Sequence, residues 1–436
     1  MNEGQELLAQ VDEEGRLVLP AGVASRYGLK PGAQVCIEEA TNSLRLRRPV
    51  RHLAKVYIEP TNRCNLECRT CIRNIWDEPL GQMDEATFAR ICESLQAFSP
   101  RPTVFFGGLG EPLAHPHIVE MVAQVKALDA PVELITNGTL LTEKLSRQLI
   151  AAGLDILWVS LDGATSETYT DVRLGAVLPQ VLANIACFRD TRLSAAFPQP
   201  YADSARFNGA PPTPDHIRPE IGIVFVAMQR NVADLPNVLR LGHHLGVTRF
   251  LVSHVLPYTA ELRADVLYAR FRGDLSDSPS VWLPYLNLPR FDVTDSIREP
   301  LYQVMRGNWK VSLAGNDLGR FTDRCPFVES GVTAIRWDGD VSPCLPLLHN
   351  HSSFLDERQR FSRHYAVGNA TQANLSDLWE SPDYVAFRER VHMFDYPPCT
   401  RCGGCELALT NEQDCFGDAF PTCGGCLWAQ GVIQCP

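Results

Sequence analysis

The chain has 436 residues, of which 45% are hydrophobic and 21% are charged, and its formal net charge is −11 at pH 7. This composition indicates a globular protein of roughly two or three domains and excludes a disordered or fibrous chain, while the acidic balance argues against nucleic-acid binding by the whole chain. No apolar run reaches the ~20 residues that span a bilayer, and the polar, acidic start is unlike a signal peptide, so we expect a cytoplasmic protein with no membrane segment.

Residues 1–52 are predicted to form a small β-module. Alternating apolar residues, a glycine turn at Gly15 and a turn at Pro31-Gly32 divide the segment into two strands, a short helix and two further strands. This pattern resembles the swapped-hairpin AbrB family, whose members usually dimerise and often bind DNA. Basic residues cluster at 45–51, yet residues 1–52 hold seven acidic and seven basic side chains. DNA binding therefore stays an open alternative beside a docking or dimerisation role.

Residues 53–320 are predicted to form an α/β unit around a parallel sheet. From about 54 to 254, short apolar runs alternate with amphipathic stretches, which is typical of parallel strands that are buried on both faces and have helices outside. The strand candidates are Lys55–Ile58, Thr103–Phe106, Val132–Thr136, Ile156–Leu161, Ile221–Ala227 and Arg249–His254. The helix candidates are Asp84–Ala97, His117–Leu128, Thr142–Ala152, Pro179–Arg189 and Val232–Leu245. The proline-rich segment Phe197–Pro219 reads as a surface insertion, and residues 255–320 show no assignable periodicity.

Three closely spaced cysteines follow the first predicted strand. They are Cys64, Cys68 and Cys71, in the segment EPTNRCNLECRTC. In a chain without an export signal, clustered thiols indicate metal ligation rather than disulfides. Three thiolates on one loop can each bind a corner of a cubane iron–sulfur cluster and leave the fourth iron open, whereas a zinc site would need a fourth ligand nearby. This C-x3-C-x2-C spacing after a first strand resembles the radical S-adenosylmethionine (SAM) superfamily.

Glycine-rich and polar segments follow the next three strands, at the sheet edge where α/β proteins place their ligands. Gly107-Gly108-Leu109-Gly110-Glu111 is similar to the segment of the superfamily that contacts the methionine amino group of SAM. Taken alone, a glycine-rich loop is more often a plain turn, and a single polar residue is as often a helix cap or turn residue as a ligand contact. By resemblance, the SAM contacts are Gly107, Gly108, Gly110, Glu111, Asn137, Ser160, Asp162 and Arg173. Thr70 stands where many relatives carry a bulky residue near the adenine, so no adenine contact is assigned.

The resemblance implies a partial (β/α)6 radical SAM barrel and the chemistry of that superfamily. There, the open iron of a [4Fe–4S] cluster chelates the amino and carboxylate groups of SAM, and one electron from the reduced cluster cleaves SAM to methionine and a 5′-deoxyadenosyl radical. It thus implies an enzyme whose catalytic cluster ligands are Cys64, Cys68 and Cys71. A ferredoxin or flavodoxin is the implied electron donor.

Nine of the 15 cysteines lie in the last part of the chain. They are Cys325, Cys344, Cys399, Cys402, Cys405, Cys415, Cys423, Cys426 and Cys435. A turn at Gly339 would bring Cys344 back near Cys325. The spacing resembles the SPASM extension of radical SAM maturases, which implies a domain over 321–436 with up to two auxiliary [4Fe–4S] clusters. Eight thiolates fill two clusters, so the partition and the role of the ninth cysteine stay open, as does a reading as structural zinc sites.

Three features together narrow the family. They are the AbrB-like module, the segment CRTCIRNIW at 68–76 and the segment FPTCGGCLWAQG at 420–431. They resemble the tungsten cofactor oxidoreductase radical SAM maturases, which implies a tungsten-dependent aldehyde oxidoreductase, or its pterin cofactor, as the partner. Two alternatives stay open: a radical SAM enzyme that crosslinks a precursor peptide, and a DNA-binding iron–sulfur redox sensor.

Overall fold

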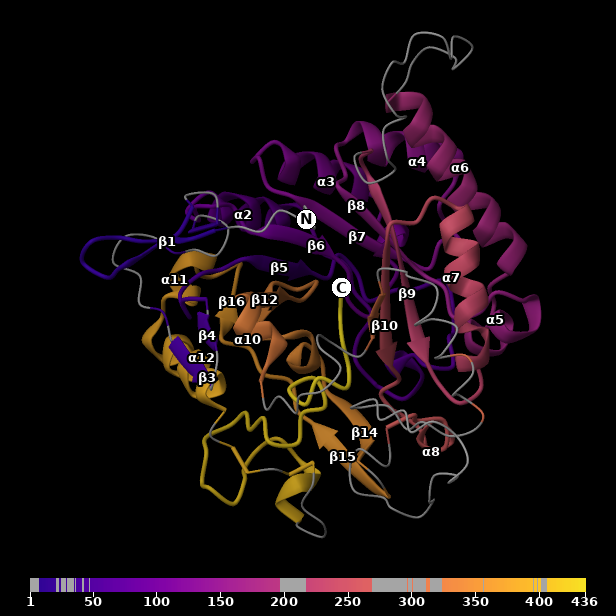
Figure 1. Ribbon diagram of the computed structural model, residues 1–436. Coiled ribbons are helices and arrows are strands. Elements are labelled where there is room, and N and C mark those ends of the chain that lie inside the picture. The colour runs from indigo at the N-terminus through magenta and orange to yellow at the C-terminus, as the bar shows by residue number, and fades with distance from the viewer. Residues whose placement is uncertain are drawn as a thin grey trace.

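The structure, a computed structural model, describes residues 8–20, 23–24, 29, 35, 37–40, 43–46, 48–196, 217–268, 296, 300, 311–313, 324–355, 357–394, 396–397, 399–400 and 406–436. A ten-stranded sheet runs through most of these residues (Figure 1). Its six central strands are parallel neighbours in chain order: β5 (Lys55–Ile58), β6 (Thr103–Phe106), β7 (Val132–Thr136), β8 (Ile156–Ser160), β9 (Glu220–Ala227) and β10 (Arg249–His254). They confirm the six predicted strands to within one residue and form the predicted partial barrel.

Helices cover the outer face of these strands (Figure 1). They are α2 (Glu85–Leu95), α3 (Ile118–Lys126), α4 (Glu143–Ala151), α5 (Ser166–Val172), α6 (Leu178–Ala196) and α7 (Leu235–His244), which follows the short 3-10 turn η4 (Val232–Asp234). Capping side chains fix where some of these helices begin. At the N-terminus of α2, for example, the Asp84 side chain accepts a hydrogen bond from the Thr87 amide. The predicted helix Pro179–Arg189 is longer than expected, since Thr191 and Arg192 continue its buried face to Ala196. Most of the predicted insertion Phe197–Pro219 lies outside the described residues.

Strands from the C-terminal third extend the barrel sheet on one side. β12 (Val332–Ile335) pairs in parallel with β5, and β13 (Asp340–Ser342) and β16 (Gly368–Asn369) follow it as antiparallel neighbours. Gly339 sits in the β12–β13 turn with φ +91°, which confirms the turn predicted there. On the other edge, β11 (Val311–Leu313) pairs in parallel with β10. The segments on either side of the predicted boundary at 320/321 therefore share one sheet.

The rest of the C-terminal third packs below the barrel as short elements. These are α10 (Pro326–Ser330), η6 (Leu345–Leu347), the hairpin of β14 (His351–Leu355) and β15 (Arg358–Ser362), α11 (Leu375–Trp379), α12 (Pro382–Met393) and η7 (Glu406–Leu409). The final segment then rises between β12 and β10 (Figure 1). There the Gln434 amide donates to Ser253 Oγ at 2.9 Å, and Lys55 Nζ donates to the Pro436 oxygen at 2.9 Å. The chain's last residues thus lie against the inner face of the barrel.

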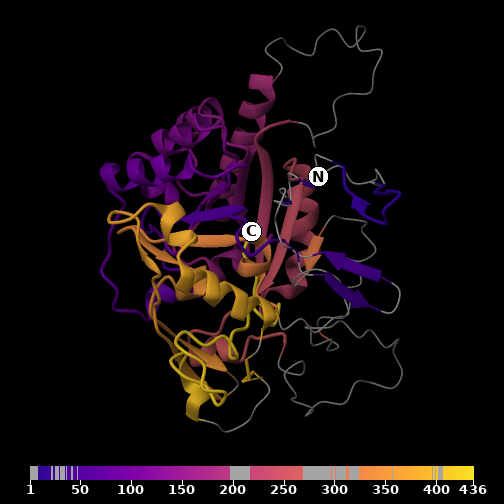
Figure 2. The ribbon, with the colours of Figure 1, turned by 90° about the vertical axis from the view of Figure 1, so that its left-hand side faces the viewer.

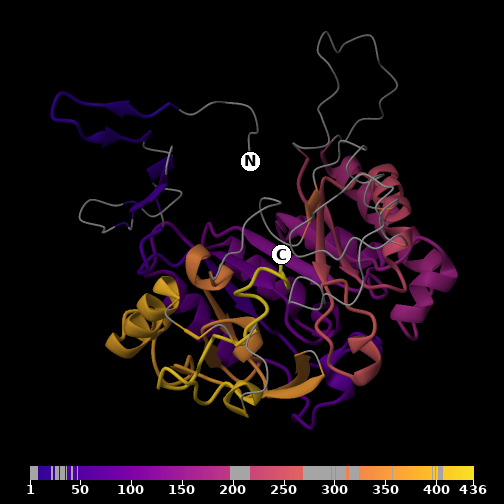
Figure 3. The ribbon, with the colours of Figure 1, turned by 60° about the horizontal axis from the view of Figure 1, so that its bottom comes forward.

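Two antiparallel hairpins make up the described part of the N-terminal module. They are β1 (Gln10–Val11) with β2 (Leu17–Val18), and β3 (Ile37–Ala40) with β4 (Ser43–Leu46). Figures 2 and 3 show these indigo strands beside the main body rather than within it. The strand–turn–strand order agrees with the prediction, and Gly15 takes φ +78° in the first turn. Among the helices that the structure describes, none has the length and apolarity needed to cross a membrane.

Candidate functional site

A pocket lies at the carboxyl ends of the barrel strands. The predicted residues that line it are Cys64, Cys68, Cys71, Gly108, Gly110, Glu111, Asn137, Ser160 and Arg173. They come from the loops after β5, β6 and β7, from the end of β8, and from the C-terminal cap of α5. The pocket therefore brings together the residues predicted as cluster ligands and SAM contacts, except for Gly107 and Asp162.

Gly107 and Asp162 support the pocket from behind. A Cβ at Gly107 would overlap with the ring of Phe105, so glycine lets the loop leave β6 against that ring. Asp162 is fully buried, accepts a hydrogen bond from the Val226 amide at 2.7 Å and pairs with Arg173 at 2.6 Å. Asp162 thereby fixes the direction of the Arg173 side chain.

The three cysteines share a loop whose sulfurs face hydrogen-bond donors. Asn137 Nδ2 donates to Cys64 Sγ at 3.8 Å, and Arg173 Nη1 donates to Cys68 Sγ at 3.7 Å. Burial raises the pKa of the Cys64 and Cys71 thiols above their ordinary value. Arg173 and Asn137 thus place a positive charge and an amide donor beside these sulfurs, which suits sulfur ligands that carry negative charge when iron is bound.

The glycine-rich loop approaches the cysteine loop so closely that side chains are excluded. A Cβ at Gly110 would overlap with the Thr61 carbonyl oxygen, and one at Gly108, where φ is +154°, would lie 2.7 Å from Glu59 Cγ. The Leu109 amide donates to Glu59 Oε1 at 3.0 Å. The missing side chains thus make room for Glu59 and for the cysteine-loop backbone, and Gly108, Leu109 and Gly110 line the pocket.

Glu111 ties the loop after β6 to the loop after β7. Its carboxylate accepts hydrogen bonds from the Leu113 amide at 3.0 Å, Thr136 Oγ1 at 2.7 Å and the Asn137 amide at 2.7 Å. Burial raises the pKa of Glu111, and these three donors oppose that shift. The arrangement holds Asn137 against Cys64 and leaves Glu111 at the pocket wall.

Neighbouring groups keep the Arg173 guanidinium protonated. Burial alone would lower the pKa of Arg173, but the Asp162 carboxylate and the nearby Cys68 raise it above its ordinary value. The guanidinium therefore faces the pocket as a fixed positive charge beside Ser160. An anionic group such as a carboxylate fits this corner of the pocket.

Tyr258 and Glu59 are site residues that sequence reasoning missed. Tyr258 follows β10 and lines the pocket, and burial together with the charges of Cys71 and Cys435 raises its pKa. Tyr258 could have been predicted, because it follows a barrel strand just as the other pocket residues do. Glu59 directly follows β5, but nothing local in the sequence indicates its contact with Leu109.

A second, largely apolar cavity lies in the C-terminal third and contains four cysteines. Its thiols come from the N-cap of α10, the N-cap of η6 and the last loop: Cys325, Cys344, Cys423 and Cys426. Burial raises the pKa of Cys325 to about 12 and also raises the pKa of Cys344, Cys423 and Cys426. The predicted return of Cys344 toward Cys325 is confirmed.

Arg360 on β15 projects into this cavity. Only 6% of the residue is exposed, and its Nη1 has no hydrogen-bond partner among the described residues. A Cβ at Gly425 would overlap with the guanidinium. Burial lowers the pKa of Arg360, while the charges of Cys426, Cys399 and Cys423 act in the opposite direction. A buried guanidinium with an unpaired donor among thiols fits a neighbouring anionic, sulfur-containing group.

The other predicted C-terminal ligands fall in different places. Cys399 lies near the cavity, since a Cβ at Gly424 would be 3.2 Å from its Sγ, whereas Cys415 is exposed. Cys402 and Cys405 lie outside the described residues. Cys435 is half-buried at the inner face of the barrel, where desolvation raises its pKa to about 11 against the nearby charge of Lys55. Within the residues that the structure describes, no three His, Cys, Asp or Glu side chains form a site for a single metal ion.

Family models and curated relatives match most of the chain. A model of the radical SAM superfamily matches residues 58–195, and the SPASM model, an iron–sulfur cluster-binding domain, matches residues 325–406. The tungsten-containing aldehyde ferredoxin oxidoreductase cofactor-modifying protein of Pyrococcus furiosus is 31% identical over 389 residues, covering 87% of this chain and 96% of that protein. PqqA peptide cyclase of Gluconobacter oxydans is 28% identical over 221 residues, which are 50% of this chain and 54% of that protein.

Solved structures share the fold at low sequence identity. The structure of anSMEcpe with AdoMet and the Kp18Cys peptide aligns with a TM-score of 0.52 and 16% identity over 87% of this chain and 95% of that chain. Streptococcus suis SuiB bound to its precursor peptide SuiA aligns with a TM-score of 0.51 and 15% identity over 81% of this chain and 70% of that chain. Neither family model reaches residues 1–52, so the AbrB resemblance stays a prediction.

Proposed function

This chain belongs to the radical SAM superfamily and carries a SPASM iron–sulfur domain, and from that premise we propose that it matures a tungsten-dependent aldehyde oxidoreductase or the cofactor of that enzyme. The observation that carries the proposal is its similarity, over nearly the whole length, to the cofactor-modifying protein of Pyrococcus furiosus. The pocket at the barrel edge supports the proposal, because it brings together the three cysteines and most of the residues predicted as SAM contacts. The identity of the partner rests on that similarity alone, because no residue of the pocket indicates which protein is modified.

The fit of the pocket to a cluster and SAM rests on its donors and its shape. Cys64, Cys68 and Cys71 would hold the cluster, and the bare backbone around Gly108 would meet the methionine part of SAM. Arg173, held by Asp162, would neutralise the SAM carboxylate. When bound, the cluster and SAM supply a one-electron cleavage that gives a 5′-deoxyadenosyl radical for hydrogen abstraction.

The four cavity thiols support a partition of the auxiliary ligands. Cys325, Cys344, Cys423 and Cys426 would hold one [4Fe–4S] cluster, because they line the same buried cavity. A second cluster would use the closely spaced set Cys399, Cys402, Cys405 and Cys415. Cys435, at the barrel's inner face beside Lys55, is then the ninth cysteine and no cluster ligand.

A gene deletion tests the proposed partner. In a strain that lacks this protein, the tungsten oxidoreductase should be synthesised in normal amounts but remain inactive. Complementation with the wild-type gene should restore its activity, whereas a Cys64→Ala gene should not. An active and fully metallated oxidoreductase in the deletion strain would contradict the proposal.

Peptide modification is the second candidate function, and the similarity to PqqA peptide cyclase favours it. That similarity covers half of this chain, so it supports the shared chemistry more than the substrate. Co-expression with a candidate peptide should then give a product lighter by two hydrogens if a crosslink forms. An unchanged peptide mass, together with an inactive oxidoreductase in the deletion strain, would favour maturation of the tungsten oxidoreductase over peptide modification.

A further inference from the structure

A buried contact between a carboxylate and an imidazole joins the glycine-rich loop to the C-terminal third. Glu59 directly follows β5, and His349 lies between η6 and β14. The distance between Glu59 Oε2 and His349 Nε2 is 2.9 Å, and the two side chains are 0% and 1% exposed. The proposed cluster ligands and SAM contacts include neither of these two side chains.

On the barrel side, Glu59 contacts two consecutive residues of the glycine-rich loop. Its Oε1 accepts the Leu109 amide at 3.0 Å, and its Cγ would lie 2.7 Å from a Cβ at Gly108. The Glu59 amide itself donates to the Ile335 oxygen of β12 at 2.9 Å. A movement of this carboxylate would therefore displace the loop that is proposed to bind SAM.

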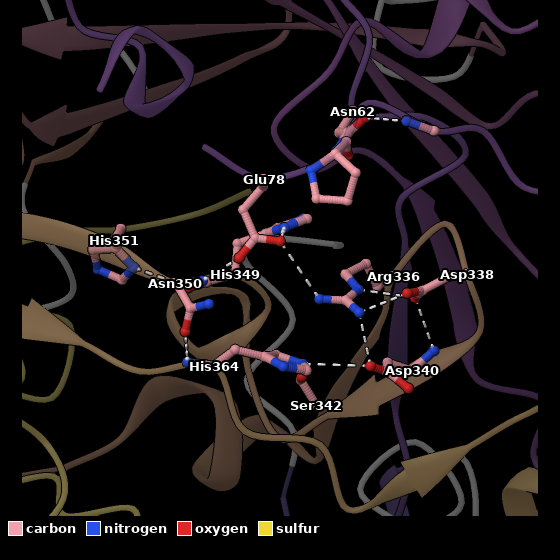
Figure 4. Close-up of polar contacts among 12 residues, drawn as sticks. Asn62, Glu78, Arg336, Asp338, Asp340, Ser342, His349, Asn350, His351 and His364 are labelled. Carbon is pink, nitrogen blue, oxygen red and sulfur yellow. Dashed lines mark hydrogen bonds and ion pairs between the residues drawn. The ribbon is translucent and has the colours of Figure 1, made fainter. Parts of the chain in front are cut away.

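On the opposite side, His349 is held in a fixed orientation (Figure 4). Its Nδ1 lies 3.6 Å from Glu78 Oε2, and its ring packs on Trp76 with centroids 4.6 Å apart. Glu78 Oε1 in turn accepts the Asn350 amide at 3.0 Å, and Arg336 lies 3.8 Å from Glu78. Trp76 and Glu78 belong to the segment just after the cysteine loop, so His349 contacts both loops of the site indirectly.

Each oxygen of the Glu59 carboxylate has one donor. Leu109 satisfies Oε1 and His349 satisfies Oε2. A buried carboxylate that loses one of two donors is strongly destabilised and must relax toward another partner. Because Gly108 and Leu109 pack on that carboxylate, its relaxation would displace the glycine-rich loop.

We propose that His349 is a positioning residue for SAM, which holds Glu59 and, through Glu59, keeps the glycine-rich loop in its binding conformation. SAM affinity then depends on a side chain of the C-terminal third. The inference rests on the proposed SAM site at Cys64, Cys68 and Cys71 and adds a residue to it.

The test compares His349→Phe with His364→Phe in anaerobically reconstituted protein. His364 is a matched control, because it lies in the same polar network, at 3.8 Å from Asp340 (Figure 4). SAM is titrated against the electron paramagnetic resonance signal of the reduced cluster, and SAM cleavage is timed in parallel. His349→Phe should raise the half-saturating SAM concentration about tenfold or more, with iron content and maximal rate within about twofold of wild type. His364→Phe should match wild type.

Two further variants separate positioning from folding. His349→Gln restores a donor toward Glu59 and should recover most of the SAM affinity. Glu59→Asp shortens the carboxylate so that it cannot reach both Leu109 and His349, and it should weaken SAM binding even if His349→Phe folds poorly.

Four results would overturn the inference. They are wild-type SAM affinity in both His349→Phe and Glu59→Asp, equal weakening in His364→Phe, weakening only in step with lost iron, and failure of His349→Gln to recover any affinity. A wild-type protein whose reduced cluster ignores SAM would instead overturn the proposed SAM site itself, so the two failures are distinguishable.

Discussion

Arg360 is a buried cation beside three thiols of the C-terminal third. The side chain is buried among Cys423, Cys426 and Cys399, and one of its nitrogens has no hydrogen-bond partner in the described part of the chain. A cation in such a place stabilises negative charge on a neighbouring cluster, most of all in the reduced state. The position therefore bears on electron transfer more than on folding.

Replacing Arg360 by Met should lower the midpoint reduction potential of at least one auxiliary cluster. The neutral side chain removes the positive charge that favours the reduced, more negative cluster. A potentiometric titration followed by electron paramagnetic resonance measures the shift. Arg358→Met, on the same strand, serves as the control and should leave the potentials in place. Identical potentials in the Arg360 variant and in wild type would count against this role.

Site residues that are marked by local spacing could be predicted, and those that depend on distant partners could not. The cysteine triad and the glycine-rich loop are recognisable because their chemistry needs neighbours within a few positions. Glu59 and His349 are separated by 290 positions, so their contact leaves no local pattern. Asp162 shows a third case, since this residue, predicted as a SAM contact, is not among the residues that line the pocket and pairs with Arg173, which is among them.

At the scale of elements, the barrel strands were predictable and the C-terminal additions to the sheet were not. β5 to β10 are short apolar runs set off by turn residues, a pattern that buried parallel strands impose on the sequence. β12 pairs with β5 only through a long-range register, Ala334 opposite Tyr57. The β14–β15 hairpin carries buried polar residues such as His351 and Arg360, which conceals the alternation of a typical strand.

The β14 hairpin should make stability sensitive to acid through His351. Burial lowers the pKa of His351 to about 4 from its ordinary value of 6.5. Between those two values the unfolded chain binds a proton that the folded chain does not, so the free energy of unfolding falls as pH falls through this window. The full effect is about 3 kcal/mol and is present above pH ~6.5.

Urea denaturation of the cluster-free protein between about pH 7 and pH 4.5 measures this dependence. His351→Gln should flatten the acid slope of the unfolding free energy, because Gln does not titrate. His243→Gln, at the exposed end of α7, should leave the slope as it is. A His351 variant with the wild-type slope would contradict the assignment.

At the scale of the whole molecule, barrel and C-terminal third form a single packed unit. One buried apolar cluster includes Ile58 and Phe106 of the barrel together with Ala334 and Trp379 of the C-terminal third. The last residues return to the inner face of the barrel at Lys55. Sequence reasoning divided the chain at 320/321, whereas sheet and core continue across that division. The cavity thiols are thereby held in a fixed relation to the pocket at the barrel edge.

Iron and sulfide analysis of the anaerobically purified protein tests the partition of the cysteines. Three [4Fe–4S] clusters correspond to about twelve irons per chain. Cys344→Ser should lower that number by about four, whereas Cys435→Ala should retain it. About four irons accompanied by bound zinc would contradict the auxiliary clusters, and loss of iron in Cys435→Ala would contradict the role given to the ninth cysteine.

The central claim is that Cys64, Cys68 and Cys71 hold the cluster at which SAM is cleaved. Its most direct test is the formation of 5′-deoxyadenosine and methionine from SAM by the dithionite-reduced protein, measured by chromatography beside a Cys64→Ala variant. The account predicts both products from wild type and neither from the variant, in which the cluster lacks one ligand. Product formation at equal rates in the two proteins, or none from wild-type protein with its full iron content, would contradict it.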